Sequence, residues 1–132
     1  MPVIEQHIYI DKYDWHLTVL YNANRDISAV AEALWSMKCS SKIALYILEN
    51  SLTSKNSGFC FTNTVIKATL ICISESESDE ELLNTVVHEA KHLQSHICSY
   101  YNIDESGEEA AYMIGDIVEK LYNVFKYELE QS

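Results

Sequence analysis

Residues 78–101 are the part of the sequence that most constrains the fold. Ser78-x-x-Glu81 is a capping box, in which two side chains satisfy the free N–H groups at the start of a helix. Beyond it apolar residues recur at helical spacing, and Asn102 suits the left-handed conformation that ends many helices. The pattern predicts one long helix with an apolar stripe of Leu82, Val86, Ala90, Leu93 and Ile97.

This helix carries the sequence His88-Glu89-Ala90-Lys91-His92, which has the pattern H-E-x-x-H. Residues four apart lie on the same helix face one turn apart, so the two imidazoles can bind one ion. Glu89 lies about 100° around the helix from His88 and can reach a water on that ion without binding the ion. The alternative is a helix with two exposed or hydrogen-bonded histidines. The motif's place on a strongly predicted helix, after a strand, favours the metal site.

A second helix is expected after Ser106, where Ser106-x-x-Glu109 offers another capping box. Its predicted apolar stripe is Ala111, Ile114, Val118, Leu121 and Phe125.

A zinc site needs at least one more protein ligand, and the second helix offers the first candidates. Glu108 is preferred, because it lies on the side of the small residues of that helix, where a neighbouring helix can approach closely. Glu109 would be occupied in capping. A tight helical hairpin would instead bring Asp116 level with His92, and His96 lies one turn further along the first helix.

The rest of the chain alternates predicted strands and helices, which favours an α+β fold. Two segments rich in β-branched and aromatic residues predict a hairpin over 4–10 and 15–21. Helices are expected over 27–38, after the capping residue Asp26, and over 41–52, although the second could also be a strand. Residues 58–63 and 67–74 are then predicted as strands. A length of 132 residues favours one domain.

Composition excludes several classes of partner. Nine Lys and Arg against twenty Asp and Glu give a net charge of −11, so neither a phosphate backbone nor an anionic membrane is an expected partner. No apolar run is long enough for a membrane span, and the first residues lack the features of a signal peptide. The four cysteines (Cys39, Cys60, Cys72 and Cys98) form no C-x-x-C pair. The four cysteines are therefore expected to be reduced thiols, and the protein is expected to be cytoplasmic.

Residues 58–115 resemble the minimal zincin-like metallopeptidases of the glutamate-ligand (gluzincin) type. More narrowly, they are similar to small uncharacterised proteins of bacterial phages and mobile elements. The shared features are a G-F-x-x-x-N segment at 58–63, the hydrophobic strand at 68–73, N-T-x-x-H-E-x-x-H at 84–92 and E-x-x-A-Y at 108–112. The resemblance implies one zincin-like domain over 1–132, with a small, mostly antiparallel sheet packed on the H-E-x-x-H helix and the following helix.

The resemblance also implies a function. His88, His92 and Glu108 would bind Zn²⁺, and Glu89 would be the general base of a peptidase that acts on a protein or peptide substrate. Residues 68–73 would be the edge strand that holds an extended substrate. The alternative is a non-catalytic metal-binding or interaction module on the same scaffold. Glu89 favours the enzyme, because a structural metal site has no need of a carboxylate beside its first ligand.

Overall fold

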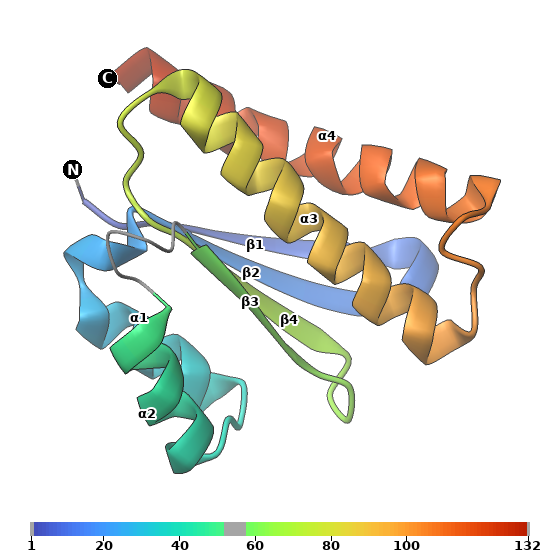
Figure 1. The fold of residues 1–132 in the computed structure, drawn as a ribbon, viewed down its shortest axis with the longest axis horizontal. Helices are drawn as coiled ribbons and strands as arrows, with labels where there is room; N and C mark the ends of the chain where they lie inside the picture. Colours follow the sequence, from blue (N-terminus) through green and yellow to red (C-terminus); the bar gives the residue numbers. More distant parts are fainter. Residues whose placement is uncertain (1, 52–57, 132) are drawn as a thin grey trace. The chain divides into compact units, whose positions relative to one another are not determined.

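Figure 1 shows the fold as a computed structural model, in which residues 2–51 and 58–131 are described, without the side chains of 122–131. The chain divides into two compact units, Met1–Glu77 and Ser78–Ser132. The first unit holds the sheet and two helices, and the second holds the H-E-x-x-H helix and the helix after it. The predicted packing of the sheet on the H-E-x-x-H helix stays a prediction.

The elements of the first unit fall where the sequence pattern predicts them. The hairpin, the two short helices and the second pair of strands are all present, and residues 41–50 are helical rather than extended. Two single-turn 3₁₀ helices, η1 (Asp11–Tyr13) and η2 (Ala23–Arg25), follow the first and second strands. The larger elements are β1 (Ile4–Ile10), β2 (Trp15–Tyr21), α1 (Ile27–Ser36), α2 (Ser41–Asn50), β3 (Gly58–Asn63) and β4 (Ala68–Ile73).

The four strands form one mixed sheet in the order β1-β2-β4-β3. The β1·β2 and β3·β4 pairs are antiparallel, whereas β2 and β4 run parallel. The prediction that residues 68–73 form an edge strand is therefore wrong, because β4 is hydrogen-bonded on both sides. All six β4 residues are buried.

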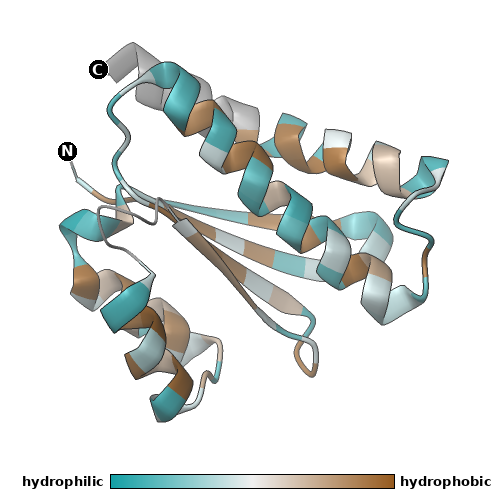
Figure 2. Ribbon diagram, in the orientation of Figure 1, coloured by the Kyte–Doolittle hydropathy of each residue, from teal (hydrophilic) through white to brown (hydrophobic). Residues whose placement is uncertain are grey.

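The core of the first unit lies between the sheet and α1 and α2. Asp26 caps α1 by accepting a hydrogen bond from the backbone N–H of Ala29. Val30 and Leu34, which share a face of α1, are fully buried against the β2 and β4 residues Leu20 and Leu70. Figure 2 shows apolar residues along β3 and β4 and a mixture of apolar and polar residues around α1 and α2.

The second unit consists of α3 (Asp79–Tyr101) and α4 (Glu108–Gln131). The Ser78 hydroxyl accepts a hydrogen bond from the Glu81 N–H, and Asn102 ends α3 in the left-handed conformation with φ 59°. Both predicted ends are confirmed. All five residues of the predicted apolar stripe of α3 are buried.

The buried face of α4 is rotated from the predicted one, although Leu121 is fully buried as predicted. Ala111 is exposed, and Ile114 and Val118 are only partly buried. The side chain of Phe125 lies outside the described residues. Ser106 does not begin the helix as predicted: its hydroxyl donates to Asp104 Oδ1, and α4 begins at Glu108. The residues buried on α4 are Ala110, Met113, Ile117 and Leu121.

None of the four cysteines forms a disulfide in the structure. Cys72 and Cys98 are buried, and the other two are partly buried. Within the described ranges, no helix has both the length and the apolar character that a membrane crossing requires.

Adjacent residues of α1 provide a test of how this helix packs. Leu34 is fully buried, whereas Trp35 is 81% exposed. We expect Leu34→Ala to lower the free energy of unfolding by about 2–5 kcal/mol, because it leaves a cavity in the core. Trp35→Ala should change it by less than about 0.5 kcal/mol. Urea denaturation followed by circular dichroism measures both values, and equal losses would mean that α1 packs through a different face.

Candidate metal site

The two histidines of the motif project from one face of α3. Their Nε2 atoms lie 3.2 Å apart, and their rings meet edge to face with centroids 4.9 Å apart. Both side chains are exposed. Two nitrogens bound at 2.0–2.1 Å to a tetrahedral zinc ion are about 3.3 Å apart. The pair therefore has the separation that two zinc ligands need, although a hydrogen bond between neutral imidazoles has a similar length.

Glu89 points in a different direction from the histidines and is buried, with 4% of its surface exposed. Its Oε2 is shielded from solvent and makes no hydrogen bond with any described residue. Burial raises the pKa of the Glu89 carboxyl, and nearby His88 opposes this effect only in part. A buried carboxylate without a partner is costly, so this group favours the approach of a proton or a cation.

The connection between α3 and α4 is held against α3 by polar contacts. Glu105 Oε2 accepts hydrogen bonds from the Ser95 hydroxyl at 3.0 Å and from the Lys91 ammonium at 3.3 Å. These bonds lower the pKa of the Glu105 carboxyl. Further along, the buried Gln94 side chain donates from Nε2 to the Ala110 carbonyl at 3.0 Å. The two helices thus form a hairpin in which Gln94 lies opposite Ala110.

This hairpin determines which α4 residues lie level with the histidines. In an antiparallel pair both helices rise equally per residue, so the Gln94–Ala110 contact places residue 112 level with His92 and residue 116 level with His88. Asp116 is therefore nearer in level to the pair than Glu108 is. Glu108 lies level with residue 96, about two turns of α3 beyond His88.

The reason for preferring Glu108 as the third ligand does not hold in the structure. Ala111 and Gly115, the small residues expected to face a neighbouring helix, are both exposed. Glu108 is also exposed and lies about 160° around α4 from the buried Ala110. As a ligand Glu108 stays a prediction, without support from the face on which it lies.

The other candidates are distributed around the two helices. Glu109 and Asp116 are exposed on α4, and His96 is partly buried on α3. Burial, with a smaller effect from His92, lowers the pKa of His96. Among the described residues, no group of three or more His, Cys, Asp and Glu side chains is close enough to hold a metal ion. The structure brings together His88 and His92, but it does not bring a third ligand to them.

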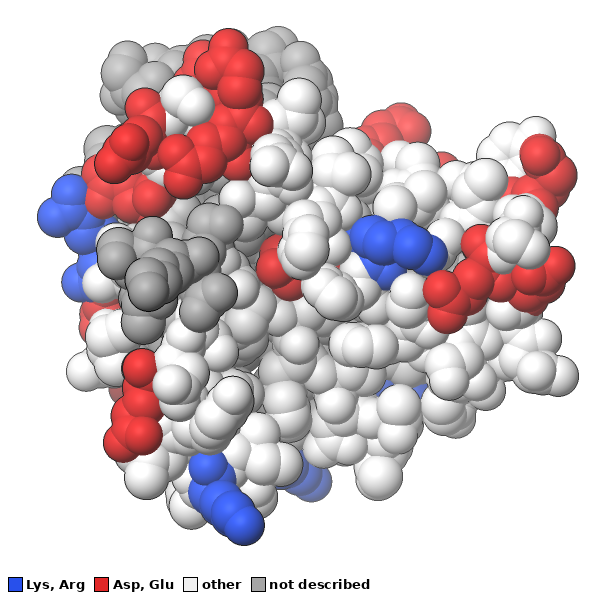
Figure 3. Space-filling model, viewed as in Figure 1, with Lys and Arg blue, Asp and Glu red and all other residues white. Residues whose placement is uncertain are grey.

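The charge around α3 favours cations. Figure 3 shows acidic side chains gathered near the N-terminal end of α3 and near the α3–α4 connection. The net charge of −11 attracts cations to the chain as a whole, whereas Lys91 places a positive charge within the motif itself.

The role of Gln94 was missed in the sequence, although a signal is present. A glutamine directly after Leu93 of the apolar stripe lies close enough to that stripe to be buried, and a buried amide needs a partner. The Ala110 carbonyl is that partner.

Comparisons with known proteins add no assignment. No protein family model, no curated protein and no solved structure matches this chain. The resemblance to zincin-like peptidases over residues 58–115 therefore rests on the sequence motifs alone.

The raised pKa of Glu89 predicts how stability depends on pH in the metal-free protein. Between the ordinary pKa of glutamic acid and the raised value, the unfolded chain loses its proton first, so rising pH favours unfolding. The neutral variant Glu89→Gln lacks this penalty. In urea denaturation with EDTA, we expect its stability relative to wild type to be greater at pH 8 than at pH 5.

The control for this experiment is Glu80→Gln, because Glu80 is exposed on the same helix. Its difference from wild type should stay the same between the two pH values. If Glu89→Gln behaved like this control, the Glu89 carboxyl would not be desolvated.

Proposed function

We propose that the protein is a zinc-dependent hydrolase, most plausibly a peptidase, in which His88 and His92 bind the metal and Glu89 is the general base. The observation that carries this proposal is the 3.2 Å separation of the two Nε2 atoms, on the same helix as a buried carboxyl whose Oε2 makes no hydrogen bond with any described residue. Zinc supplies a Lewis acid that lowers the pKa of water. The proposal includes a peptide as the substrate. It also includes Glu108 as the third zinc ligand, which the resemblance to gluzincins implies.

Glu89 has the properties that a general base needs. Its Oε2 has no hydrogen bond to a described residue that must break before it accepts a proton from an attacking water. Its raised pKa moves the carboxyl toward the range in which a group both takes up and returns a proton near neutral pH. The same carboxyl can then deliver that proton to the leaving amine.

A non-catalytic metal-binding or interaction module is the second candidate. It is favoured by the exposure of both histidines and by the absence of a third ligand beside them among the described residues. Such a module would retain the metal but have no use for the base. Variants of Glu89 therefore distinguish the two functions.

The metal site predicts one zinc per chain. We expect His88→Ala and His92→Ala each to weaken zinc binding by more than about 100-fold, because losing a ligand costs more than losing an outer hydrogen-bond partner. His16→Ala, which removes an exposed imidazole from the sheet, should leave affinity unchanged. Isothermal titration of metal-stripped protein measures all three, and equal losses in all three would refute a specific site.

The same titration identifies the third ligand. Among Glu108→Gln, Glu109→Gln, Asp116→Asn and His96→Ala, one variant should lose affinity as severely as the histidine variants. If none does, the two histidines are the only protein ligands among these candidates, and the non-catalytic module gains support.

If Glu89 is the general base, its substitution should affect peptide hydrolysis but not zinc binding. Glu89→Gln should retain zinc yet lose peptide hydrolysis by about 10²–10⁴-fold, the usual contribution of a general base. Glu80→Gln, on the same helix, should behave as wild type. Cleavage of a broad peptide library, followed by mass spectrometry, measures both. Zinc bound by wild type and Glu89→Gln without cleavage by either would contradict the enzyme.

A further inference from the structure

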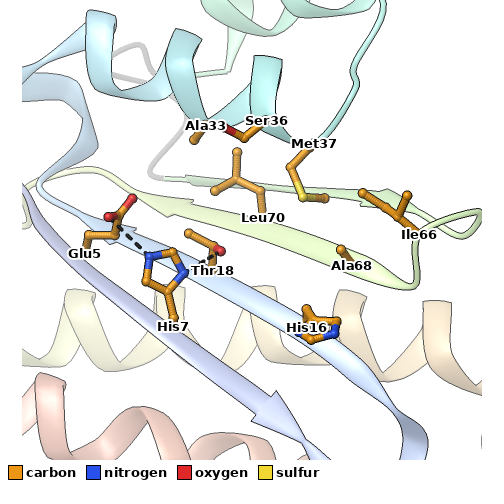
Figure 4. A pocket seen from close by; sticks show the side chains of 10 residues that line it. All are labelled: Glu5, His7, His16, Thr18, Ala33, Ser36, Met37, Ile66, Ala68 and Leu70. Carbon is orange, nitrogen blue, oxygen red and sulfur yellow. Dashed lines mark hydrogen bonds and ion pairs between the residues drawn. The ribbon is translucent and has the colours of Figure 1, made fainter.

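A second feature lies entirely in the first unit, on the sheet face that packs against α1 and α2. These helices cover β3, β4 and part of β2, and they leave a pocket of about 300 Å³ beside β1. We call it the His7 pocket. Figure 4 shows side chains from the β1–β2 hairpin on one side and from α1 on the other. Its volume is at the lower end of the range for small-molecule sites.

One rim of the His7 pocket consists of three side chains in a row: His7 shares a hydrogen bond with Thr18 and forms an ion-pair contact with Glu5. His7 lies between Thr18, whose Oγ1 is 3.0 Å from Nδ1, and Glu5, whose Oε2 is 3.3 Å from Nε2. The hydrogen bond to Thr18 orients the His7 ring, and Nε2 then faces the Glu5 carboxylate. These contacts hold the Glu5 carboxylate at the mouth of the pocket. Its other oxygen, Oε1, bonds to no described residue.

The opposite side of the His7 pocket is apolar. Met37 and Ala33 line it from α1, and Leu70 lines it from β4. A methionine thioether makes favourable contacts with aromatic rings and adapts to their shape. A ligand therefore needs an apolar body on this side and a polar group at the Glu5 rim.

The charge of the lining determines the sign of that polar group. No Lys or Arg is among the ten residues drawn in Figure 4, and Glu5 is their only carboxylate. The whole chain carries a net charge of −11, so its field also opposes an anion.

A metal ion is a poorer fit, although His7, His16 and Glu5 all line the pocket. Both nitrogens of His7 already have protein partners. These residues also form no group of three close enough to hold a metal ion. The ligand must instead use the apolar wall.

We propose that the His7 pocket binds a small organic cation: a primary amine on an aromatic or branched alkyl body. The ammonium group pairs with Glu5, and the body packs against Met37 and Ala33. This site does not depend on the metal site, since every residue that lines it belongs to the first unit.

The test uses three probes of matched size on the full chain: 2-phenylethylamine, 2-phenylethanol and phenylacetate. Titration of ¹⁵N-labelled protein at pH 7.5 should show saturable shifts at residues 5, 7, 18 and 37 for the amine. The Kd should be about 1 mM, the order expected for a ligand of about nine non-hydrogen atoms. The alcohol should bind at least fivefold more weakly than the amine, and phenylacetate should not bind.

Matched variants separate the carboxylate from general charge. Glu5→Gln should weaken amine binding at least fivefold, whereas Glu49→Gln, which removes an exposed carboxylate from α2, should change it less than twofold. Ser36→Leu, at an exposed α1 position that lines the pocket, should block binding without altering charge.

Several results would overturn the proposal: no saturable shifts, equal binding of phenylacetate, equal loss in the two glutamate variants, or binding that survives Ser36→Leu. EDTA and His88→Ala should leave amine binding unchanged. This control keeps failure of the amine site distinct from failure of the metal site.

Discussion

The helical repeat of α3 is the constraint on which the candidate site depends. One period of 3.6 residues places His88 and His92 together on an exposed face and turns Glu89 by about 100°, into buried surroundings. The same backbone geometry therefore explains why the two imidazoles are exposed to solvent and why the Glu89 carboxyl is buried. No loop has to be positioned to obtain them. Ser78 at one end and Asn102 at the other fix where the helix begins and ends, and so keep this arrangement in place.

Burial of Glu89 works against folding in the absence of a cation. An aliphatic residue at this position would pack without a desolvation penalty, so the carboxylate is not there for stability. Gln94 shows the contrast on the same helix, because its buried amide is satisfied by the Ala110 carbonyl and helps to set the hairpin. The buried Gln94 amide stabilises the second unit, whereas the buried Glu89 carboxyl has an oxygen without a hydrogen-bond partner among the described residues. That difference is the strongest structural reason to assign Glu89 a chemical role.

The local sequence pattern was sufficient to predict where helices and strands lie in the chain. It was not sufficient to predict which elements pair or pack with one another. The strand and helix ranges follow from β-branched runs and capping residues, which act within a few positions along the chain. The central place of β4 depends on the parallel pairing with β2, which joins residues about fifty positions apart and leaves no mark on either strand. The face of α4 was misjudged because Ala110 and Ala111 are equally suited to burial. The structure buries Ala110 together with Met113, Ile117 and Leu121, and the choice of third ligand depends on that rotation of α4.

The central position of β4 also changes how an extended substrate can bind. A strand that pairs with β2 on one side and with β3 on the other has no free N–H and C=O groups to offer, so strand addition can use only β1 or β3. The two proposed sites would use charge differently. The Glu5 side chain is exposed to water and lies beside an apolar wall. Glu89 is buried, so a nearby positive charge or an incoming proton changes its energy far more. This difference supports the proposals of proton transfer at Glu89 and of recognition by charge and shape at Glu5.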